Sequence, residues 1–335
     1  MGRRFLQTFL ILVLLTPVAI SYTNCSAGGG GGATGTPAPT PYFPVADPNP
    51  DGLKIYIADF GNGRYVRVDD LSGAGFTEID TVAGIKFKEP WHGATDSTGR
   101  IYFADNENHR IIRMDDIQGT NAVAFGTQGN GVNQFNQPSA VCIDTTDKIY
   151  IVDHGQGRMV RIDDMNGTNW TTYGQGGTGV GEFHGHKKCA FDSMGRIYIS
   201  DGENYRIVRI DNMTGANWVS YDLGNPGTFM PPDAVAVDSS DRIYFAQPYH
   251  HRIVRINDMT GAGYVALSTG PGGQSLNLPH DIWIAPSGKI FITDTGHGAI
   301  VRINDMTGAD WFSYGSYSTT PATHYFYAPK GVFGF

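Results

Sequence analysis

Residues 54–70 read KIYIADFGNGRYVRVDD, and variants of this stretch return five more times along the chain. The later copies begin at Arg100, Lys148, Arg196, Arg242 and Lys289, so the spacing is 46 to 48 residues. In each copy, two short runs of alternating apolar residues flank a four-residue loop, as expected for two antiparallel strands. The repeat is therefore a structural unit of almost constant length.

Two further strands complete each unit. One follows a Pro, as in PSAVCID at residues 138–144, and the other follows a DMTGA-like turn, as in NWTTYG at residues 169–174. A strand-rich period near 47 residues is typical of propeller blades. The sequence predicts an all-β protein, a six-bladed β-propeller with four-stranded blades.

The two ends of the repeat region are incomplete in complementary ways. The first unit lacks the strand that should precede Ile55, while the chain ends on a spare one, PKGVFGF at residues 329–335. If this C-terminal strand pairs into the first blade, the ring closes and hides sheet edges that would otherwise recruit other chains.

The residues before the repeats indicate export. Residues 1–24 combine Arg3 and Arg4 with an apolar run typical of a signal peptide, and residues 25–52 form a Gly/Pro-rich tether before the propeller at 53–335. Cys25 after such a segment resembles the lipidation site of bacterial lipoproteins, although Tyr22 and Asn24 depart from the usual box. The alternative is cleavage after Ser21, which leaves Cys25 an ordinary thiol.

We therefore expect an extracytoplasmic, membrane-anchored bacterial lipoprotein at the outer membrane or cell surface. The formal net charge of −8 becomes −10 once Arg3 and Arg4 are removed. An acidic protein of this kind is not expected to bind nucleic acid, because binding to the phosphate backbone needs positive charge.

The stretch FGTQGNGVNQFNQPSAVCIDTTDKIYIVDHGQGRMVRID at residues 125–163 resembles the NHL repeat, and the resemblance covers residues 54–335. It implies a β-propeller. It leaves function open, because NHL propellers include lyases, protein binders and RNA binders.

All ten histidines are predicted on one surface of the ring, made by the loops between second and third strands and by the connections between blades. Lysines join them there, whereas acidic pairs such as Asp69-Asp70 occupy turns on the opposite side. We call the first side the His/Lys surface and expect it to respond to pH.

The strongest site candidates follow the Pro of each inner strand, or His186 where it stands at the equivalent position, at the mouth of the central channel. The ligand-binding candidates are Trp91, His92, Lys187, Lys188, Asp233, His280, Asp281 and Lys330. One interpretation is that Lys187, Asp233, Asp281 and Lys330 neutralise one another around the axis. The other is that Lys187, Lys188 and Lys330 hold an anionic or polar ligand that stacks on Trp91.

An enzyme of this fold would need a metal or a catalytic set. By resemblance, the peptidyl-hydroxyglycine amidating lyases hold zinc with a His directly after the Pro in three blades, and here only Pro279-His280 matches. A different trio, His92, His186 and His280, comes from alternate blades and is the candidate for a divalent metal. No catalytic residue and no other cofactor is assigned.

The remaining repeated residues are expected to be structural. An Asp that ends the second strand and an Arg that begins the third recur in nearly every unit and predict a framework salt bridge or loop cap. Gln247 and Ala299 interrupt this pattern. Cys142 and Cys189 stand one position out of register in adjacent blades, so we expect two buried thiols instead of a disulfide.

Together these features predict a monomeric binding or interaction module that meets a protein, glycan or small anionic ligand through its His/Lys surface. The alternative is a metal-dependent lyase or lactonase-like enzyme with a His site at the channel mouth.

Overall fold

The computed structural model describes residues 52–224, 231–320 and 322–335, without the side chain of His186. The predicted signal peptide, Cys25 and nearly all of the tether lie outside the described residues. None of the helices in the described part has the length and apolarity of a bilayer-spanning segment.

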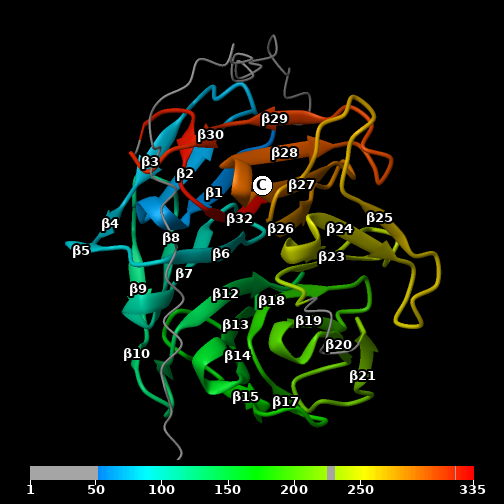
Figure 1. Ribbon diagram of the computed structural model, residues 1–335. Coiled ribbons are helices and arrows are strands. Elements are labelled where there is room, and N and C mark those ends of the chain that lie inside the picture. The colour runs from blue at the N-terminus through cyan, green and yellow to red at the C-terminus, as the bar shows by residue number, and fades with distance from the viewer. Residues whose placement is uncertain (1–51, 225–230, 321) are drawn as a thin grey trace, which may run out of the picture. The chain divides into compact units, whose positions relative to one another are not determined.

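The described chain is an all-β propeller in which each repeat forms four antiparallel strands (Figure 1). The first sheet contains β1 (Ile55–Asp59), β2 (Arg64–Val68), β3 (Thr77–Ile79) and β32 (Pro329–Gly334). There are three other four-stranded sheets. One contains β18 (His186–Phe191), β19 (Ile197–Asp201), β20 (Arg206–Ile210) and β21 (Val219–Asp222), and the next contains β22 (Val235–Val237), β23 (Ile243–Gln247), β24 (Arg252–Ile256) and β25 (Val265–Leu267). The third contains β26 (Pro279–Ile284), β27 (Ile290–Asp294), β28 (Ala299–Ile303) and β29 (Phe312–Tyr314).

One larger sheet has eight strands. It runs through β6 (Pro90–Thr95), β7 (Ile101–Asp105), β8 (Arg110–Met114), β9 (Val123–Phe125), β12 (Pro138–Ile143), β13 (Ile149–Asp153), β14 (Arg158–Ile162) and β15 (Thr171–Tyr173). Its two halves meet at a single parallel bridge between His92 and Ala140.

Short elements connect these strands. Two-stranded ribbons are β4 (Thr81–Val82) with β5 (Ile85–Lys86), β10 (Thr127–Gln128) with β11 (Gln134–Phe135), β16 (Gln175–Gly176) with β17 (Glu182–Phe183), and β30 (Ser316–Tyr317) with β31 (Tyr325–Phe326). Single 3-10 turns between second and third strands are η1 (Phe60–Asn62), η2 (Asn106–Asn108), η3 (His154–Gln156), η4 (Gly202–Asn204), η6 (Pro248–His250) and η7 (Thr295–His297).

The ends of the repeat region pair as the sequence predicts. β32 runs antiparallel to β1, with Gly334 opposite Ile55 and Val332 opposite Ile57. Backbone hydrogen bonds between Lys54 and Phe335 extend the ladder. The inner strands β32, β6, β12, β18, β22 and β26 then contact one another in a closed series, β26 returning to β32. The axis of this series carries the candidate site.

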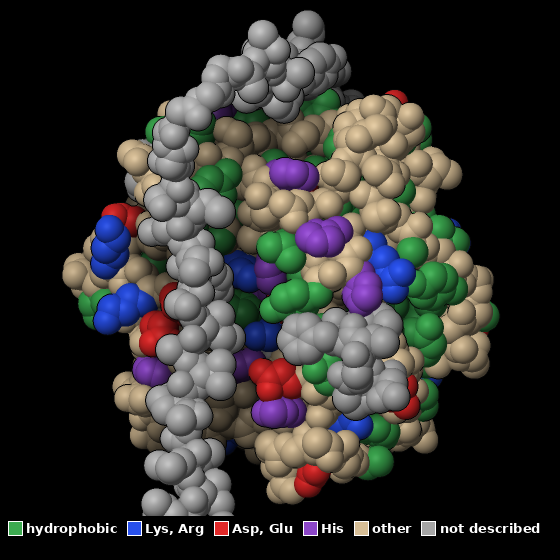
Figure 2. Space-filling model, viewed as in Figure 1, with side chains coloured by type: hydrophobic (Ala, Val, Ile, Leu, Met, Phe, Trp, Pro, Cys, Tyr) green, Lys and Arg blue, Asp and Glu red, His purple; other side chains and the backbone are tan. Residues whose placement is uncertain are grey.

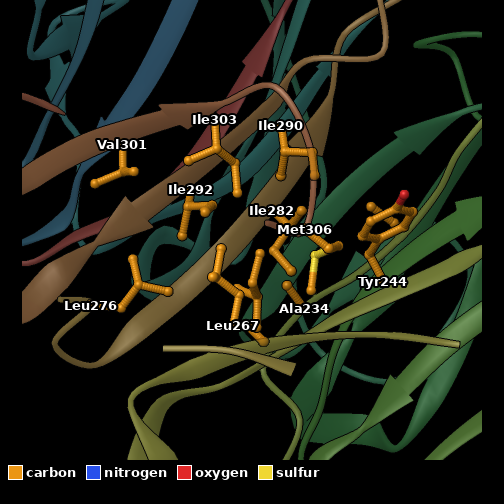
Figure 3. Close-up of a cluster of buried hydrophobic side chains, with 13 residues drawn as sticks. Ala234, Tyr244, Leu267, Leu276, Ile282, Ile290, Ile292, Val301, Ile303 and Met306 are labelled. Carbon is orange, nitrogen blue, oxygen red and sulfur yellow. The ribbon is translucent and has the colours of Figure 1, made fainter. Parts of the chain in front are cut away.

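The core lies between neighbouring sheets, as Figure 3 shows for β22–β25 against β26–β29. Tyr244 and Leu267 on one sheet pack against Ile290, Ile292 and Ile303 on the next. Each sheet uses one face for the preceding neighbour and the other for the following one, so every residue of a second strand is buried. Alternation of the apolar residues thus separates two buried faces instead of a buried and a solvated one.

The prediction of two separate thiols is wrong, because Cys142 and Cys189 form a disulfide with a Cα–Cα distance of 6.1 Å. Cys142 lies opposite Tyr150, and Cys189 lies opposite Ile199, so the cysteines are one position out of register as the sequence indicates. Opposite faces of successive sheets pack together, however, and this offset brings the two side chains into one cluster.

We expect the disulfide to stabilise the fold measurably. It closes a loop with a sequence separation of 47 residues, for which loop-closure entropy predicts about 2–4 kcal/mol. The double variant Cys142→Ala/Cys189→Ala should lower the free energy of unfolding by that amount in urea titrations. Wild-type protein with reductant is the matched control and should behave alike. Alkylation of both cysteines in unfolded, unreduced protein would contradict the assignment.

Candidate functional site

A buried ion pair anchors the loops of the His/Lys surface. In four repeats the Arg that begins the third strand donates through Nε to the Asp that ends the second. The pairs are Arg64–Asp59, Arg110–Asp105, Arg158–Asp153 and Arg206–Asp201, at 2.7 to 2.8 Å. These carboxylates are fully buried. Burial raises the pKa of Asp59, Asp153 and Asp201, and the paired guanidinium offsets part of that effect.

The same carboxylates hold the connection that enters each inner strand. Asp153 accepts the backbone N–H of Asn136 at 2.7 Å, and Asp201 accepts that of His184 at 2.8 Å. Arg158 and Arg206 donate to carbonyl oxygens in the preceding connection. The predicted framework salt bridge is therefore confirmed, and it fixes the surface loops relative to the sheets.

The two interrupted repeats keep the contact with different chemistry. Gln247 accepts from Arg252 Nε at 2.7 Å in place of a carboxylate. Where Ala299 replaces the Arg, the ring of His297 contacts Asp294 at 2.8 Å instead. That contact raises the pKa of His297 above its usual value. His297 thus performs a structural role that its position in the repeat did not reveal.

A bulge at the start of the inner strands brings consecutive side chains toward the axis. The register shifts by one residue after Pro90, Pro138, His186 and Pro279. Bulges re-aim side chains and often occur beside functional sites. Here they allow the neighbours Lys187 and Lys188 to make different contacts, Lys187 with the Trp91 ring and Lys188 with Asp281.

The first cluster is centred on Asp281, which is buried, with an exposed fraction of 1%. Lys188 Nζ lies 2.5 Å from Oδ1, and His92 Nδ1 lies 3.0 Å from Oδ2. The backbone N–H groups of Ile282 and Val332 also donate to this carboxylate. Burial opposes its ionisation, but Lys188 and His92 outweigh that effect and hold the pKa of Asp281 below its usual value. The cluster joins β6, β18, β26 and β32 across the axis.

The second cluster contains Asp233, His280 and Lys330. His280 Nδ1 is in hydrogen-bonding contact with Asp233, while Lys330 Nζ lies 2.8 Å from His280 Nε2. Burial and the nearby ammonium lower the pKa of His280, so the ring is neutral at pH 7. Burial also lowers the pKa of Lys330, to about 8. The geometry fits a chain in which Lys330 donates to His280 and His280 donates to Asp233.

Lys187 differs from both clusters because its ammonium lies over an aromatic ring, 4.6 Å from the centroid of Trp91. Within the described chain it forms no ion pair. Lys330 also approaches the Trp91 ring, at 5.9 Å. The indole N–H of Trp91 is buried and lacks a hydrogen-bond partner among the described residues. An incoming acceptor would relieve that unsatisfied donor.

A pocket of about 130 Å³ adjoins Lys187 and Asp233. The pocket is also lined by Glu203, Tyr205 and Tyr249, which the sequence analysis did not identify as site residues. They come from η4, from the residue after it and from η6, and only the three-dimensional contact of two neighbouring sheets brings them to Lys187. Figure 2 shows histidine side chains around the middle of this surface, with basic and acidic groups between them.

The eight ligand-binding candidates thus gather in one region, with different roles. His92, Lys188 and Asp281 are engaged with one another, as are Asp233, His280 and Lys330. The metal trio is not assembled in the described part of the chain, because the side chain of His186 lies outside it. Among the described residues, no group of three or more His, Cys, Asp or Glu side chains is arranged to hold a metal ion.

Comparisons with known proteins support the propeller fold. No protein-family model matches the sequence, and no curated protein matches it. A structure of the nidogen/laminin complex aligns with a TM-score of 0.63 and 16% identity over 84% of this chain and 98% of that chain. Virginiamycin B lyase from Staphylococcus aureus aligns with a TM-score of 0.53 and 18% identity over 78% of this chain and 80% of that chain.

A catalytically inactive variant of that lyase with quinupristin aligns with a TM-score of 0.54 and 16% identity, over 82% of this chain and 87% of that chain. At these identities the likeness shows the fold alone. The neighbours include an enzyme and a protein–protein complex, so the fold is compatible with both kinds of function.

Replacing Asp281 should destabilise the ring. In Asp281→Asn the Lys188 ammonium stays buried without its counter-charge, which typically costs about 3–5 kcal/mol. Thermal and urea unfolding measure the loss. The exposed Asp222→Asn removes the same charge from the surface and should change stability by less than about 0.5 kcal/mol. Equal stability of the two variants would show that the Asp281 cluster is not a structural lock.

Proposed function

We propose that the chain is a six-bladed NHL-type propeller, exported and lipid-anchored through Cys25, that binds acidic groups on its His/Lys surface. The binding set is Lys187, Lys330 and Trp91. Two groups of residues adjoin this set. One is the cluster of His92, Lys188 and Asp281, and the other is the pair of His280 and Asp233, which contacts Lys330 through His280.

The blade count rests on the eight-stranded sheet. Each half has the strand order of a complete blade, and only the bridge between His92 and Ala140 connects them. Counting the halves separately gives one blade for each sequence repeat. The closed series of inner strands agrees with six equivalent wedges around one axis.

Export is supported by the Cys142–Cys189 disulfide, because disulfides persist mainly in oxidising compartments outside the cytoplasm. With the signal-like residues 1–24 and Cys25, it favours a membrane-anchored lipoprotein at the outer membrane or cell surface. The tether would then hold the propeller at a distance from the bilayer.

The observation that carries the binding proposal is the Lys187 ammonium, which faces the Trp91 ring instead of a carboxylate. A cation over an aromatic face beside a second buried amine attracts a carboxylate, sulfate or phosphate group. The unsatisfied indole N–H of Trp91 supplies a further donor. Such a group could belong to a small molecule, an acidic glycan or an acidic protein segment, and the nidogen neighbour makes a protein partner plausible.

The alternative is a metal-dependent lyase or lactonase-like enzyme with His92, His186 and His280. The lyase among the structural neighbours favours it. Against it, the rings of His92 and His280 already contact Asp281 and Asp233. Elemental analysis of purified protein, with activity measured with and without chelator, separates the two functions.

We expect Lys187→Gln to weaken binding of galacturonate at least tenfold, which corresponds to about 1.4 kcal/mol. Neutral galactose, which has no carboxylate, should bind to the variant and to the wild type with the same affinity. Isothermal titration calorimetry measures both affinities. Lys88→Gln is the matched control because Lys88 is an exposed lysine in the connection before Pro90. Equal galacturonate affinity for Lys187→Gln and wild type would remove Lys187 from the site.

A second prediction uses the pKa of Lys330, which burial lowers to about 8. Between pH 8 and about 10.5 the unfolded chain binds a proton at this amine that the folded protein has lost. The contribution of Lys330 to the free energy of unfolding should therefore rise by about 3 kcal/mol across that interval.

The measurement compares wild type with Lys330→Met, which keeps the length of the side chain without a titratable group. Urea unfolding at pH 7.5, 8.5 and 9.5 gives the difference between the two proteins at each pH. Lys330→Arg keeps its charge throughout and is the control for charge alone. A constant difference between wild type and Lys330→Met would show that the amine titrates as an ordinary exposed lysine.

A further inference from the structure

The channel has a second half, on the far side of the Asp281 cluster from the His/Lys surface. A cavity of about 310 Å³ lies there and is lined from all the inner strands. Its lining includes Val141, Phe191, Val235, Trp283 and Phe333. None of its lining residues belongs to the pocket beside Lys187. The two spaces are therefore distinct sites.

The cavity meets a charged layer at one end and a vestibule at the other. Lys188 lines its inner end, where the ammonium is engaged by Asp281 and by the carbonyl of Ile282 at 2.8 Å. At the outer end it shares Thr95, Ile143, Val237, Trp283 and Ile284 with a vestibule of about 520 Å³. A small molecule can therefore enter from the turns between first and second strands.

The walls combine aromatic faces with backbone polar groups. Trp283 and Phe191 are partly exposed, and the Cys142–Cys189 disulfide forms part of the wall. β18, β22, β26 and β32 are edge strands of their sheets, so their inner N–H and C=O groups lack a strand partner. This mixture suits a planar ring that presents apolar faces and hydrogen-bonding atoms at its edge.

The vestibule selects for charge. Asp96, Asp144, Asp147 and Asp238 line it, and no Lys or Arg from the described ranges does. Arg100 and Arg242 compensate Asp96 and Asp238 from outside the vestibule. Asp144 bonds to Thr146 and Asp147 bonds to Ser97. Four carboxylates therefore face two guanidinium groups, and Arg100 is also close enough to Asp147 to interact with it electrostatically. The entrance keeps a net negative charge, which disfavours an anionic ligand.

We propose that this cavity is a second ligand site, for a small planar heteroaromatic molecule that is neutral or cationic. It is independent of the acidic ligand proposed for the His/Lys surface, because the two sites share no residues and prefer opposite charges.

The test uses the full-length protein with 5-fluorotryptophan in place of its five tryptophans. Each ¹⁹F resonance is assigned by a Trp→Phe variant. Tryptamine should shift the resonance of Trp283 and leave that of Trp91 unchanged. Indole-3-acetate, which has the same ring with a negative charge, should bind at least tenfold more weakly. A shift of Trp91 instead of Trp283, or no shift of Trp283 at millimolar tryptamine, would overturn the proposal.

A variant that obstructs the cavity provides a second readout. Ala190 lines it, so Ala190→Phe should abolish the tryptamine response. Ala266→Phe, on the exposed side of β25, adds the same ring elsewhere and should leave the response intact. Circular dichroism checks that both variants fold. If Ala190→Phe does not fold, the ¹⁹F experiment on the protein without this substitution decides whether the cavity binds tryptamine. Unchanged tryptamine affinity in a folded Ala190→Phe protein would also overturn the proposal.

Discussion

The buried Asp–Arg pair between the second and third strands is the interaction on which the surface depends. Its carboxylate serves three partners at once: the guanidinium, the turn that follows the second strand, and the N–H of the connection entering the inner strand. A carboxylate buried without them would cost several kcal/mol. The pair therefore fixes where each inner strand begins, and with it the height at which residues after the Pro reach the axis.

Most of the fold could be predicted because it repeats. The pairing of residues 329–334 with β1, the strand order and the Asp–Arg framework follow from a period that returns along the whole chain. The disulfide was missed because register was compared as if equivalent faces met, whereas successive sheets meet through opposite faces. The bulges were missed because one extra residue leaves no mark in a pattern of apolar residues.

The bulges also explain why the roles of consecutive residues could not be assigned from the sequence. Lys187 and Lys188 are chemically identical, yet Lys188 neutralises Asp281 and Lys187 faces Trp91. Asp281 accepts three hydrogen bonds and also contacts the His92 ring, so both of its oxygens are already engaged. Internal neutralisation and ligand binding, which the sequence presented as alternatives, therefore apply to different members of the same set.

Function in this molecule should be sought where the repeats differ. The framework positions hold Asp or Arg in almost every unit, as symmetry of the ring requires. The position after the Pro, or after His186 in the repeat that lacks it, holds Trp91, Ser139, Lys187, Asp233, His280 and Lys330, and no two neighbours around the ring have the same side chain. A symmetric scaffold does not need such variety, and burying it costs hydration free energy. The charged layer also divides the channel into an aromatic mouth that carries lysines and acidic groups and a largely apolar cavity with an acidic entrance, two environments that equivalent repeats could not produce.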